Sequence, residues 1–429
     1  MLISTFDVPR SQPDWAATSF TSDGYRAVPV TARFGPIDFD EFHLQELPER
    51  LAAGNGKLAA AHLARCRPIA FRLDDGRAYT YTPSADGIVI EPGDAEAQTV
   101  VELSHEDWCD FVWELKTCFA LLYADRIKIP VGSFGQVSRW EPALRAAFDG
   151  QPVYDYNDPP PVVDASGDPL DLTTSFTLDD SDDVIVDFLR RAGFVHLKGV
   201  FSADEVAAMR ADVERAVADA RPDDRHSWWT TVDGEEVCNR VNYLNEHSKV
   251  IAALSDDPRL KRIGALGGPE LRDTSDRLDG HNVVIKVPGA ETGLADLPWH
   301  RDCGMGGHPV KCPLLNVGIQ LDAATAASGQ LHMIAGSHLG TSQLPSDDQV
   351  KGLPTTAIVT EPGDVTAHWG HTLHAAPPPG DRKAAGRRAI YVTYVNPLTF
   401  DMVGPGQGYN DVLFTRNDGR VRHADEFTS

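Results

Sequence analysis

The sequence predicts a mixed α+β protein made of two units, the second of which is larger and rich in strands. Short β-branched runs bounded by glycine or proline recur in both halves. Two serines, Ser104 and Ser202, precede apolar residues at helical spacing. Residues 151–170 between the halves are rich in proline, glycine and aspartate, as linkers are. A chain of 429 residues also exceeds the usual size of one domain.

We expect the first unit, residues 1–150, to combine a small sheet with helices. Strands are predicted at 68–73, 78–82, 87–91, 99–103 and 126–131. Asp74-Asp-Gly76 indicates a hairpin between the first two strands. One helix is expected to start at Ser104 and another to lie around Trp140 to Phe148. The apolar residues that support the first helix are Trp108, Val112, Leu115, Phe119 and Leu122.

The second unit is expected to span residues 171–429, after the linker at 151–170. Ser202 and Glu205 form a capping box that should start a helix. Its apolar stripe consists of Val206, Met209, Val213 and Val217. Strands are predicted at 281–287, 314–321 and 388–395. Residues 329–338 are expected to form a strand that leads into a turn, and residues 360–368 a turn and a short strand.

His300-Arg-Asp302 is the triplet in this unit that points to chemistry. Two other His-x-acid triplets occur in the chain, and such a short motif arises easily by chance. His105-Glu-Asp107 stands at a helix start, and His423-Ala-Asp425 belongs to the tail. His300 and Asp302 lie near predicted strands, where residues i and i+2 project to the same side. They could therefore reach one metal ion together.

A second imidazole is offered by His368, His371 or His374. We prefer His374 because it directly precedes the Pro-rich turn at 375–380, which brings the chain back beside its partner strand; His371 remains the competitor. Two imidazoles and one carboxylate on one face of a metal leave positions open for a cosubstrate and oxygen, as in non-haem iron(II) sites.

Arg387 and Arg388 follow this turn and begin the next predicted strand. Adjacent strand residues face opposite sides, so one of the two should point inward and reach the far carboxylate of a 2-oxo acid. Arg387 is the first choice and Arg388 the alternate.

Residues of about 170–400 resemble the phytanoyl-CoA dioxygenase family of iron(II)/2-oxoglutarate oxygenases. The segments that carry the resemblance, in order, are 193–206, 286–289, 298–302, 329–338, 363–364, 373–374 and 387–390. The resemblance implies a double-stranded β-helix, or jelly roll, with flanking helices. It also implies that Fe(II), 2-oxoglutarate and O2 are used.

Residue roles follow from the same resemblance. It makes His300, Asp302 and His374 the metal ligands and Arg387 the partner of the 2-oxoglutarate carboxylate. Lys286 is a weaker candidate for contact with cosubstrate or substrate.

The chain departs from the family where many members carry a hydroxyl residue after the distal histidine. Ala375 and Ala376 stand there instead, so Thr372 is a further candidate for the carboxylate. Related halogenases replace the metal-binding carboxylate by a small residue. Asp302 therefore favours hydroxylation over halogenation.

Residues of about 45–150 resemble the sterol carrier protein 2 family in the order of strands and helices, and in the phrases 73–76 and 126–129. The resemblance implies a curved sheet over an apolar cavity. Two roles stay open for this unit, namely lipid binding and service as a scaffold.

Composition restricts the partners. The formal net charge of −24 argues against nucleic acid and anionic membranes, which both reward clustered positive charge. Six widely spaced cysteines and the lack of a long apolar stretch lead us to expect a cytoplasmic protein without a membrane span. A small molecule is the expected partner, and the sequence leaves the oligomeric state open.

The favoured function is hydroxylation of a small or apolar metabolite, in natural-product biosynthesis or lipid metabolism. One alternative is an inactive lipid-binding protein. The other is a zinc hydrolase that uses the same two histidines and carboxylate.

Overall fold

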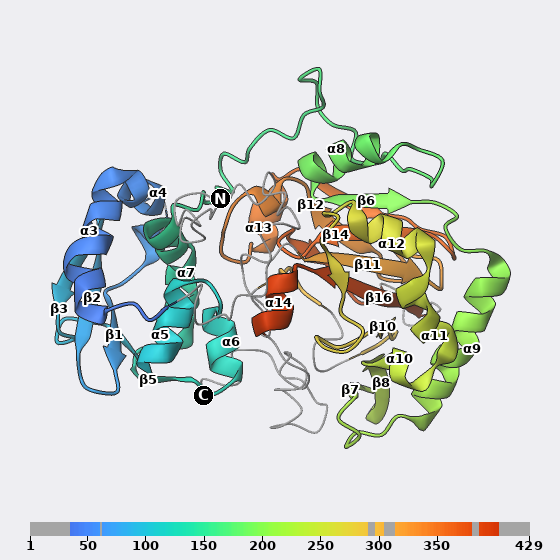
Figure 1. The fold of residues 1–429 in the computed structure, drawn as a ribbon, viewed down its shortest axis with the longest axis horizontal. Coiled ribbons are helices and arrows are strands. Elements are labelled where there is room, and N and C mark those ends of the chain that lie inside the picture. The colour runs from blue at the N-terminus through green and yellow to red at the C-terminus, as the bar shows by residue number, and fades with distance from the viewer. Residues whose placement is uncertain (1–34, 61, 291–296, 304–313, 380–385, 403–429) are drawn as a thin grey trace, which may run out of the picture.

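The two expected units lie side by side in the computed structural model, which describes residues 35–60, 62–290, 297–303, 314–379 and 386–402 (Figure 1). The first unit is drawn in blue and cyan, and the second runs from green to red. None of the described helices is long and apolar enough to cross a bilayer. The triplet His423-Ala-Asp425 lies outside the described residues.

The first unit contains one mixed sheet. Its strands are β1 (Ile69–Leu73), β2 (Ala78–Ser84), β3 (Gly87–Pro92), β4 (Thr99–Leu103) and β5 (Ile127–Val131). Their order is β3-β2-β1-β4-β5, with β1 and β4 parallel and the other neighbours antiparallel. The predicted hairpin is present between β1 and β2, where Gly76 adopts a φ of 89° that suits glycine.

Helical segments pack with this sheet. They are α2 (Phe39–Glu41), α3 (Leu47–Arg50), α4 (Gly56–Ala60), α5 (His105–Val112), α6 (Cys118–Tyr123) and α7 (Phe134–Asp149), with π-helical turns at Phe42–Glu46 and Leu51–Asn55 and a 3-10 turn at Leu63–Arg65. The single helix predicted from Ser104 through Leu122 is wrong, because two helices occupy this stretch. Glu114 takes a left-handed φ of 60°, and Thr117 then caps α6 by accepting a hydrogen bond from the Ala120 amide.

Aromatic rings fill the centre of the first unit. Trp108 meets Phe39 at 4.7 Å and Phe42 at 5.2 Å between ring centroids, and Phe148 meets Phe42 at 5.5 Å and Phe111 at 6.4 Å. All four pairs are edge-to-face, the arrangement that the ring quadrupoles favour. Lipid binding by this unit stays a prediction.

Two antiparallel sheets of unequal size make the second unit. The large sheet contains β6 (Phe194–Leu197), β7 (Ser227–Val232), β8 (Glu235–Val241), β9 (Arg272–Asp273), β10 (Asn282–Lys286), β11 (Leu315–Gln320), β14 (Val365–Trp369) and β16 (Arg387–Val395). Its order is β6-β14-β11-β16-β10-β8-β7, and β9 pairs with β16. The small sheet, in the order β13-β12-β15, contains β12 (Leu331–Ile334), β13 (Thr355–Ile358) and β15 (His374–Ala375).

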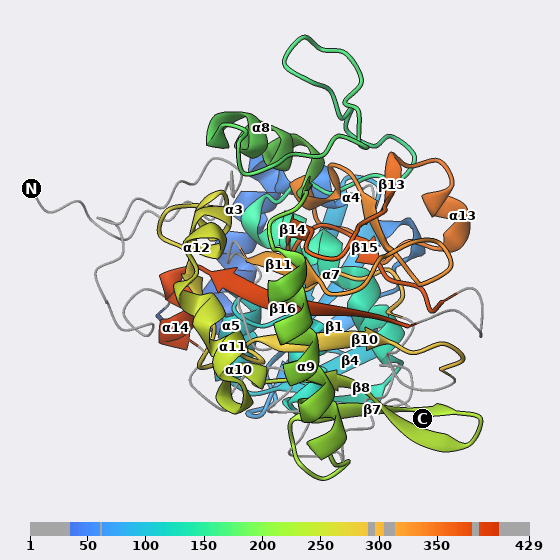
Figure 2. The same ribbon diagram turned by 90° about the vertical axis from the view of Figure 1, so that its right-hand side faces the viewer.

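Helices cover the outside of the large sheet (Figure 2). They are α8 (Asp182–Ala192), α9 (Ala203–Asp219), α10 (Leu244–His247), α11 (Lys249–Ala252) and α12 (Pro258–Ala265), with a 3-10 turn at Ala253–Asp256. The second unit also contains α13 (Asp347–Val350), ahead of β13 in the chain, α14 (Pro397–Met402), which follows β16, and a 3-10 turn at Ser337–Leu339. The predicted capping box of Ser202 and Glu205 is present at the start of α9. Val206, Met209 and Val213 are buried, as the apolar stripe requires.

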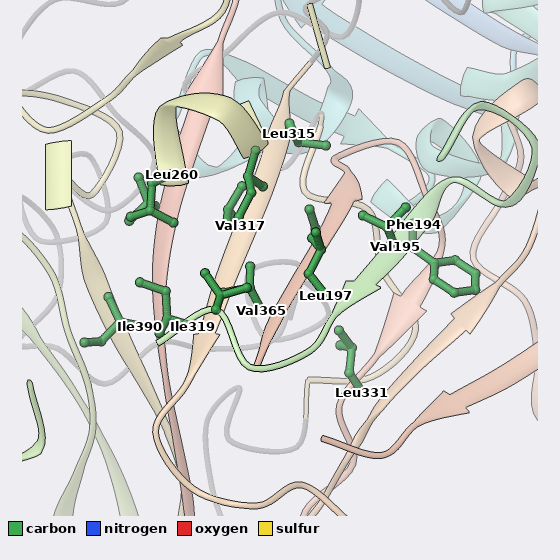
Figure 3. Packing of buried hydrophobic residues seen from close by; sticks show 14 of the residues in the cluster. Phe194, Val195, Leu197, Leu260, Leu315, Val317, Ile319, Leu331, Val365 and Ile390 are labelled. Atoms are coloured by element: carbon green, nitrogen blue, oxygen red, sulfur yellow. The ribbon is translucent and has the colours of Figure 1, made fainter. Parts of the chain in front are cut away.

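Alternation along β11 divides the second unit into a core and an inner face. Leu315, Val317 and Ile319 belong to the main apolar cluster, together with Leu260 of α12 (Figure 3). Asn316 and the other even-numbered residues of β11 face the opposite way. The large sheet therefore packs its apolar face under the helices and turns a polar face inward.

The predicted linker at residues 151–170 packs against the second unit at its start and is not fully exposed there. Tyr154 is buried, and its amide donates a hydrogen bond of 2.8 Å to the carbonyl of Thr341. The hydroxyl of Tyr156 donates to Ser342 Oγ at 2.9 Å. The first residues of the linker are thus fixed to the second unit.

Two buried histidines should make the folded state sensitive to acid. Burial is the main cause that lowers the pKa of His43 and of His338 from 6.5 to about 4. His43 also bonds the Phe39 carbonyl and the Tyr81 hydroxyl, both at 2.6 Å. Between these pKa values the unfolded chain binds more protons than the folded chain, so stability is complete above pH 6.5 and falls as the pH drops toward 4.

We predict that each of these histidines accounts for a loss of roughly 3 kcal/mol between pH 7 and 4. Urea unfolding across this range should show a flatter pH dependence for His43→Gln and for His338→Gln than for the unmodified protein. His247→Gln replaces an exposed histidine and serves as the control. Equal slopes for all four proteins would contradict the assignment.

Candidate metal centre

The structure brings His300, Asp302 and His374 together, and one ligand atom from each lies within 4.8 Å of the other two. Asp302 Oδ1 is 3.5 Å from His300 Nε2 and 3.6 Å from His374 Nε2. His300 and Asp302 follow β10 in the chain, and His374 comes from β15. A β-bridge holds the two histidines opposite each other, with backbone hydrogen bonds of 2.9 and 3.0 Å.

Backbone carbonyls orient both imidazoles. His300 Nδ1 lies 2.7 Å from the carbonyl oxygen of Pro298, and His374 Nδ1 lies 2.9 Å from that of Thr372. A carbonyl oxygen only accepts, so each Nδ1 carries the hydrogen and donates. Each Nε2 then has a lone pair directed at the cluster. Carbonyl partners of this kind fix the tautomer of metal-binding histidines.

Asp302 is held by two further side chains. Its Oδ2 accepts a hydrogen bond of 3.0 Å from Asn316 Nδ2 of β11 and lies 3.2 Å from His368 Nε2 of β14. Asn316 and His368 are cross-strand neighbours. With Oδ2 occupied, Oδ1 is the oxygen that faces the two histidines.

The electrostatics of the cluster favour a bound cation. Burial alone would raise the pKa of Asp302, but the surrounding imidazoles of His374, His300 and His368 hold it well below the usual value. Burial and the nearby His300 lower the pKa of His374 well below its usual value. An ionised carboxylate and neutral imidazoles are the forms that bind a metal. The donor set of two nitrogens and one oxygen fits Fe(II) and also Zn(II).

His371, the competitor of His374, faces elsewhere. It lines a separate cavity next to the first unit, and its carbonyl accepts a hydrogen bond of 2.8 Å from Arg301 Nε. The guanidinium of Arg301 also donates to the carbonyls of Ser337, Gly340 and Ser342. Arg301, which lies between the ligands His300 and Asp302 in the chain, therefore anchors this segment on the side away from the cluster.

A cavity of about 150 Å³ lies against the cluster. Three neighbouring strands, β8, β10 and β16, contribute Arg240, Asn282 and Tyr391 to its wall. Gly318 of β11 makes room for one of these side chains, since a Cβ there would lie 2.9 Å from a ring carbon of Tyr391. Apolar side chains, including Leu297, complete the wall.

Arg387 and Lys286 lie at one end of the inner face. They are cross-strand partners on β16 and β10, and both are buried. Arg387 Nε donates to the Gly329 carbonyl at 2.6 Å. Burial raises the pKa of Tyr391, and the nearby charge of Arg387 acts to lower it. Lys286 Nζ donates to the Ala376 carbonyl, two residues beyond His374.

Two candidates for cosubstrate binding are placed away from the cavity, and those expectations are wrong. Arg388 faces the outer side of the sheet, where its Nε bonds Asp322 at 2.7 Å and its Nη1 bonds Glu214 at 2.9 Å. Thr372 Oγ1 donates to the Gly193 carbonyl at 2.8 Å. Strand alternation explains the first case. The second depends on the packing of Thr372 against a segment far away in the sequence.

The comparison with protein families matches a part of the second unit. Residues 189–384 match the family described as phytanoyl-CoA dioxygenase (PhyH), a segment that contains the cluster and Lys286 but ends before Arg387. None of the curated proteins compared with the chain matches it.

Several solved structures are similar over about half of the chain. AviO1 from Streptomyces viridochromogenes Tue57 is 25% identical and covers 51% of this chain and 96% of its own, with a TM-score of 0.42. SnoK, a non-heme alpha ketoglutarate dependent carbocyclase from nogalamycin biosynthesis, is 22% identical, with 52% and 87% covered and a TM-score of 0.41. EctD from S. alaskensis with bound Fe is 19% identical, with 56% and 83% covered and a TM-score of 0.41.

We predict that His300→Ala, Asp302→Ala and His374→Ala each abolish stoichiometric binding of Fe(II) without unfolding the protein, because the apolar core lies on the other face of the sheet. Anaerobic equilibrium dialysis measures the bound metal, and circular dichroism checks the fold. His371→Ala is the matched control and should bind Fe(II) normally. Normal binding by the His374 variant together with loss in the His371 variant would exchange their roles.

We also predict a smaller effect at the residues that hold Asp302. Asn316→Ala and His368→Ala free Oδ2, so the carboxylate loses its orientation and metal affinity should fall about 10- to 100-fold. Competition with a chelator measures this affinity. Metal affinity equal to that of the unmodified protein in both variants would show that Asp302 needs no such support.

Proposed function

We propose that the second unit is an oxygenase that uses Fe(II), 2-oxoglutarate and O2 to oxidise a C–H bond of a small molecule. One observation carries the proposal. The ligand atoms of His300, Asp302 and His374 lie together, and Asp302 contacts Asn316 on the inner face of the large sheet, the sheet that carries the buried, paired cations Arg387 and Lys286. The match to a dioxygenase family over residues 189–384 supports the same conclusion.

His300, Asp302 and His374 would hold the iron. Three protein ligands of this kind would leave positions free for a cosubstrate and oxygen. The chemistry that iron and 2-oxoglutarate supply is oxidative decarboxylation of the 2-oxo acid, coupled to oxidation of the substrate. The side chains around the cluster fix its ligands, and the apolar part of the cavity wall limits access of water.

Arg387 would bind the far carboxylate of 2-oxoglutarate. Its planar guanidinium suits a carboxylate, and burial strengthens a charge-assisted hydrogen bond. The Gly329 carbonyl fixes the direction of this side chain. Lys286 on the paired strand adds a second positive charge at the same end of the inner face.

Hydroxylation is the outcome that we propose for the substrate. Asp302 provides an oxygen ligand at the position that the related halogenases leave to chloride. Its two partners, Asn316 and His368, hold it in place for that role.

A zinc hydrolase remains the second candidate, because the same nitrogen and oxygen atoms fit Zn(II). Metal-assisted hydrolysis would not require Arg387, because no 2-oxo acid has to be bound. Anaerobic addition of Fe(II) and then 2-oxoglutarate separates the two functions. A visible charge-transfer band from the chelated 2-oxo acid is expected for the oxygenase. A protein that binds Zn(II) but never forms this band would overturn the proposal.

We predict that Arg387→Ala raises the 2-oxoglutarate concentration needed for half-formation of this band by a factor equivalent to about 2–3 kcal/mol. Arg388→Ala removes the neighbouring arginine on the outer face and should leave the titration unchanged. Arg387→Lys keeps the charge but loses the planar pair of N–H donors, so its 2-oxoglutarate requirement should lie between those of Arg387→Ala and Arg388→Ala. Loss in the Arg388 variant alone would show that the facing of β16 is misassigned.

A further inference from the structure

Arg240 is a polar residue of the cavity wall that the proposed chemistry does not use. Its side chain is 18% exposed, and the residue lines the cavity together with Trp228 and Asp279, which both hold its guanidinium. Within the part of the chain that the structure describes, Nη1 makes no hydrogen bond, since the guanidinium donates through Nε and Nη2 alone. Nη1 is also not one of the side-chain atoms that are buried without a partner. An unpartnered atom that is not buried has accessible surface, so a ligand in the cavity can reach it.

Three contacts fix the direction of the guanidinium. Nε donates to Asn242 Oδ1 at 2.7 Å, and Nη2 donates to Asp279 Oδ2 at 2.8 Å. The group lies over the Trp228 ring, 4.9 Å from its centroid. Because a guanidinium is planar, the two occupied nitrogens also fix the direction of the N–H groups on Nη1. A ligand that accepts from Nη1 therefore loses little entropy in ordering this side chain.

The charge of Arg240 is already balanced by Asp279, its ion-pair partner. Leu278 and Asp279 have φ values of 52° and 80°, in the left-handed region that residues with a side chain avoid. The Tyr243 amide donates to the Asp279 carbonyl at 2.6 Å and helps to fix this turn. Such strain persists mainly where it places a side chain for function. Since the pair is balanced, a neutral acceptor is sufficient at Nη1, and an anion would also face the Asp279 carboxylate.

Arg240 stands apart from the residues proposed to bind the 2-oxo acid. It pairs with Val284 across β8 and β10, whereas Arg387 pairs with Lys286 across β10 and β16. The two arginines therefore lie on opposite sides of β10. Apolar side chains make up much of the remaining cavity wall, namely Leu278, Val284, Leu297, Leu314, Leu331 and Ala376. An open donor beside apolar side chains fits a molecule with an apolar body and an acceptor oxygen.

We propose that Arg240 binds the substrate through a neutral carbonyl oxygen, as in a ketone or an ester, which accepts a hydrogen bond from Nη1. The inference rests on the proposed oxygenase function for the identity of the cavity as a substrate site. A carbonyl oxygen accepts without bringing a donor that would need its own partner among the apolar side chains. The expected small or apolar metabolite is thus narrowed to one with an apolar body and a carbonyl group.

Three probes with the same six-membered ring test this chemistry: cyclohexanone, methylenecyclohexane and cyclohexanecarboxylate. Each is titrated by ligand-observed NMR into the full metal-free chain and into its Arg240 variants. Cyclohexanone and methylenecyclohexane share one shape, but only the ketone has an acceptor, so their comparison isolates the hydrogen bond from apolar contacts. Because these titrations need no iron, they test Arg240 even if the charge-transfer band never forms.

Arg240→Lys is the decisive variant, because it keeps a positive charge beside Asp279 and removes the planar group that carries Nη1. The affinity for cyclohexanone should fall about tenfold, as expected for loss of a hydrogen bond from a charged donor, while that for methylenecyclohexane stays unchanged. Arg240→Met combined with Asp279→Asn removes both charges and should show the same selective loss. Thermal unfolding checks the fold of each variant. Arg388→Lys makes the same change in an outer-face arginine that is paired with Asp322, and it serves as the control.

Unchanged cyclohexanone binding in the Arg240 variants, or an equal loss for cyclohexanone and methylenecyclohexane, overturns the proposal. No binding of cyclohexanone to the unmodified protein also overturns it. A larger loss for cyclohexanecarboxylate than for cyclohexanone overturns it in favour of an anionic substrate. Selective loss of the ketone in a protein that never forms the charge-transfer band would refute the oxygenase function alone and support the role of Arg240 in binding.

Discussion

The antiparallel bridge between His300 and His374 is the contact on which the site depends. Two backbone hydrogen bonds, of 2.9 and 3.0 Å, join residues that are 74 positions apart and bring their imidazole centroids to 4.1 Å, with the ring planes 49° apart. The carbonyls of Pro298 and Thr372 then fix the same tautomer in both rings. Backbone geometry alone thus sets most of the metal-binding arrangement, and only Asp302 relies on other side chains.

The two-residue period of β-strands distributes the remaining functions. Along β16 it turns Arg387 inward and Arg388 outward to Asp322 and Glu214. Along β11 it gives one face to the apolar core and the other to Asn316. The same sheet can therefore carry stability and chemistry without conflict, since each face has its own residues.

Local sequence patterns predicted the features of the site and fold that depend only on residues close together in the chain. The spacing of His300 and Asp302, the alternation of Arg387 and Arg388 and the capping box at Ser202 are of this kind.

Features that depend on contacts between distant parts of the chain were not predicted. His368 reaches Asp302 because its strand pairs with the strand of Asn316. The Thr372 hydroxyl donates to the Gly193 carbonyl and therefore does not face the cavity. The helix after Ser104 breaks because Thr117 caps a new helix, a competition that apolar spacing does not reveal. Asp279 entered no motif, because its place depends on a left-handed turn.

Arg301 links the segment of His300 and Asp302 to the loop on which the linker packs, and this limits how the chain can be divided. Its guanidinium grips the carbonyls of Gly340 and Ser342, on either side of Thr341, which pairs with the start of the linker through Tyr154. A truncation that begins at residue 171 would remove the hydrogen bond between Tyr154 and Thr341, next to the carbonyls that hold Arg301. A fragment of the second unit meant for expression or domain exchange should therefore retain the linker from its first residues.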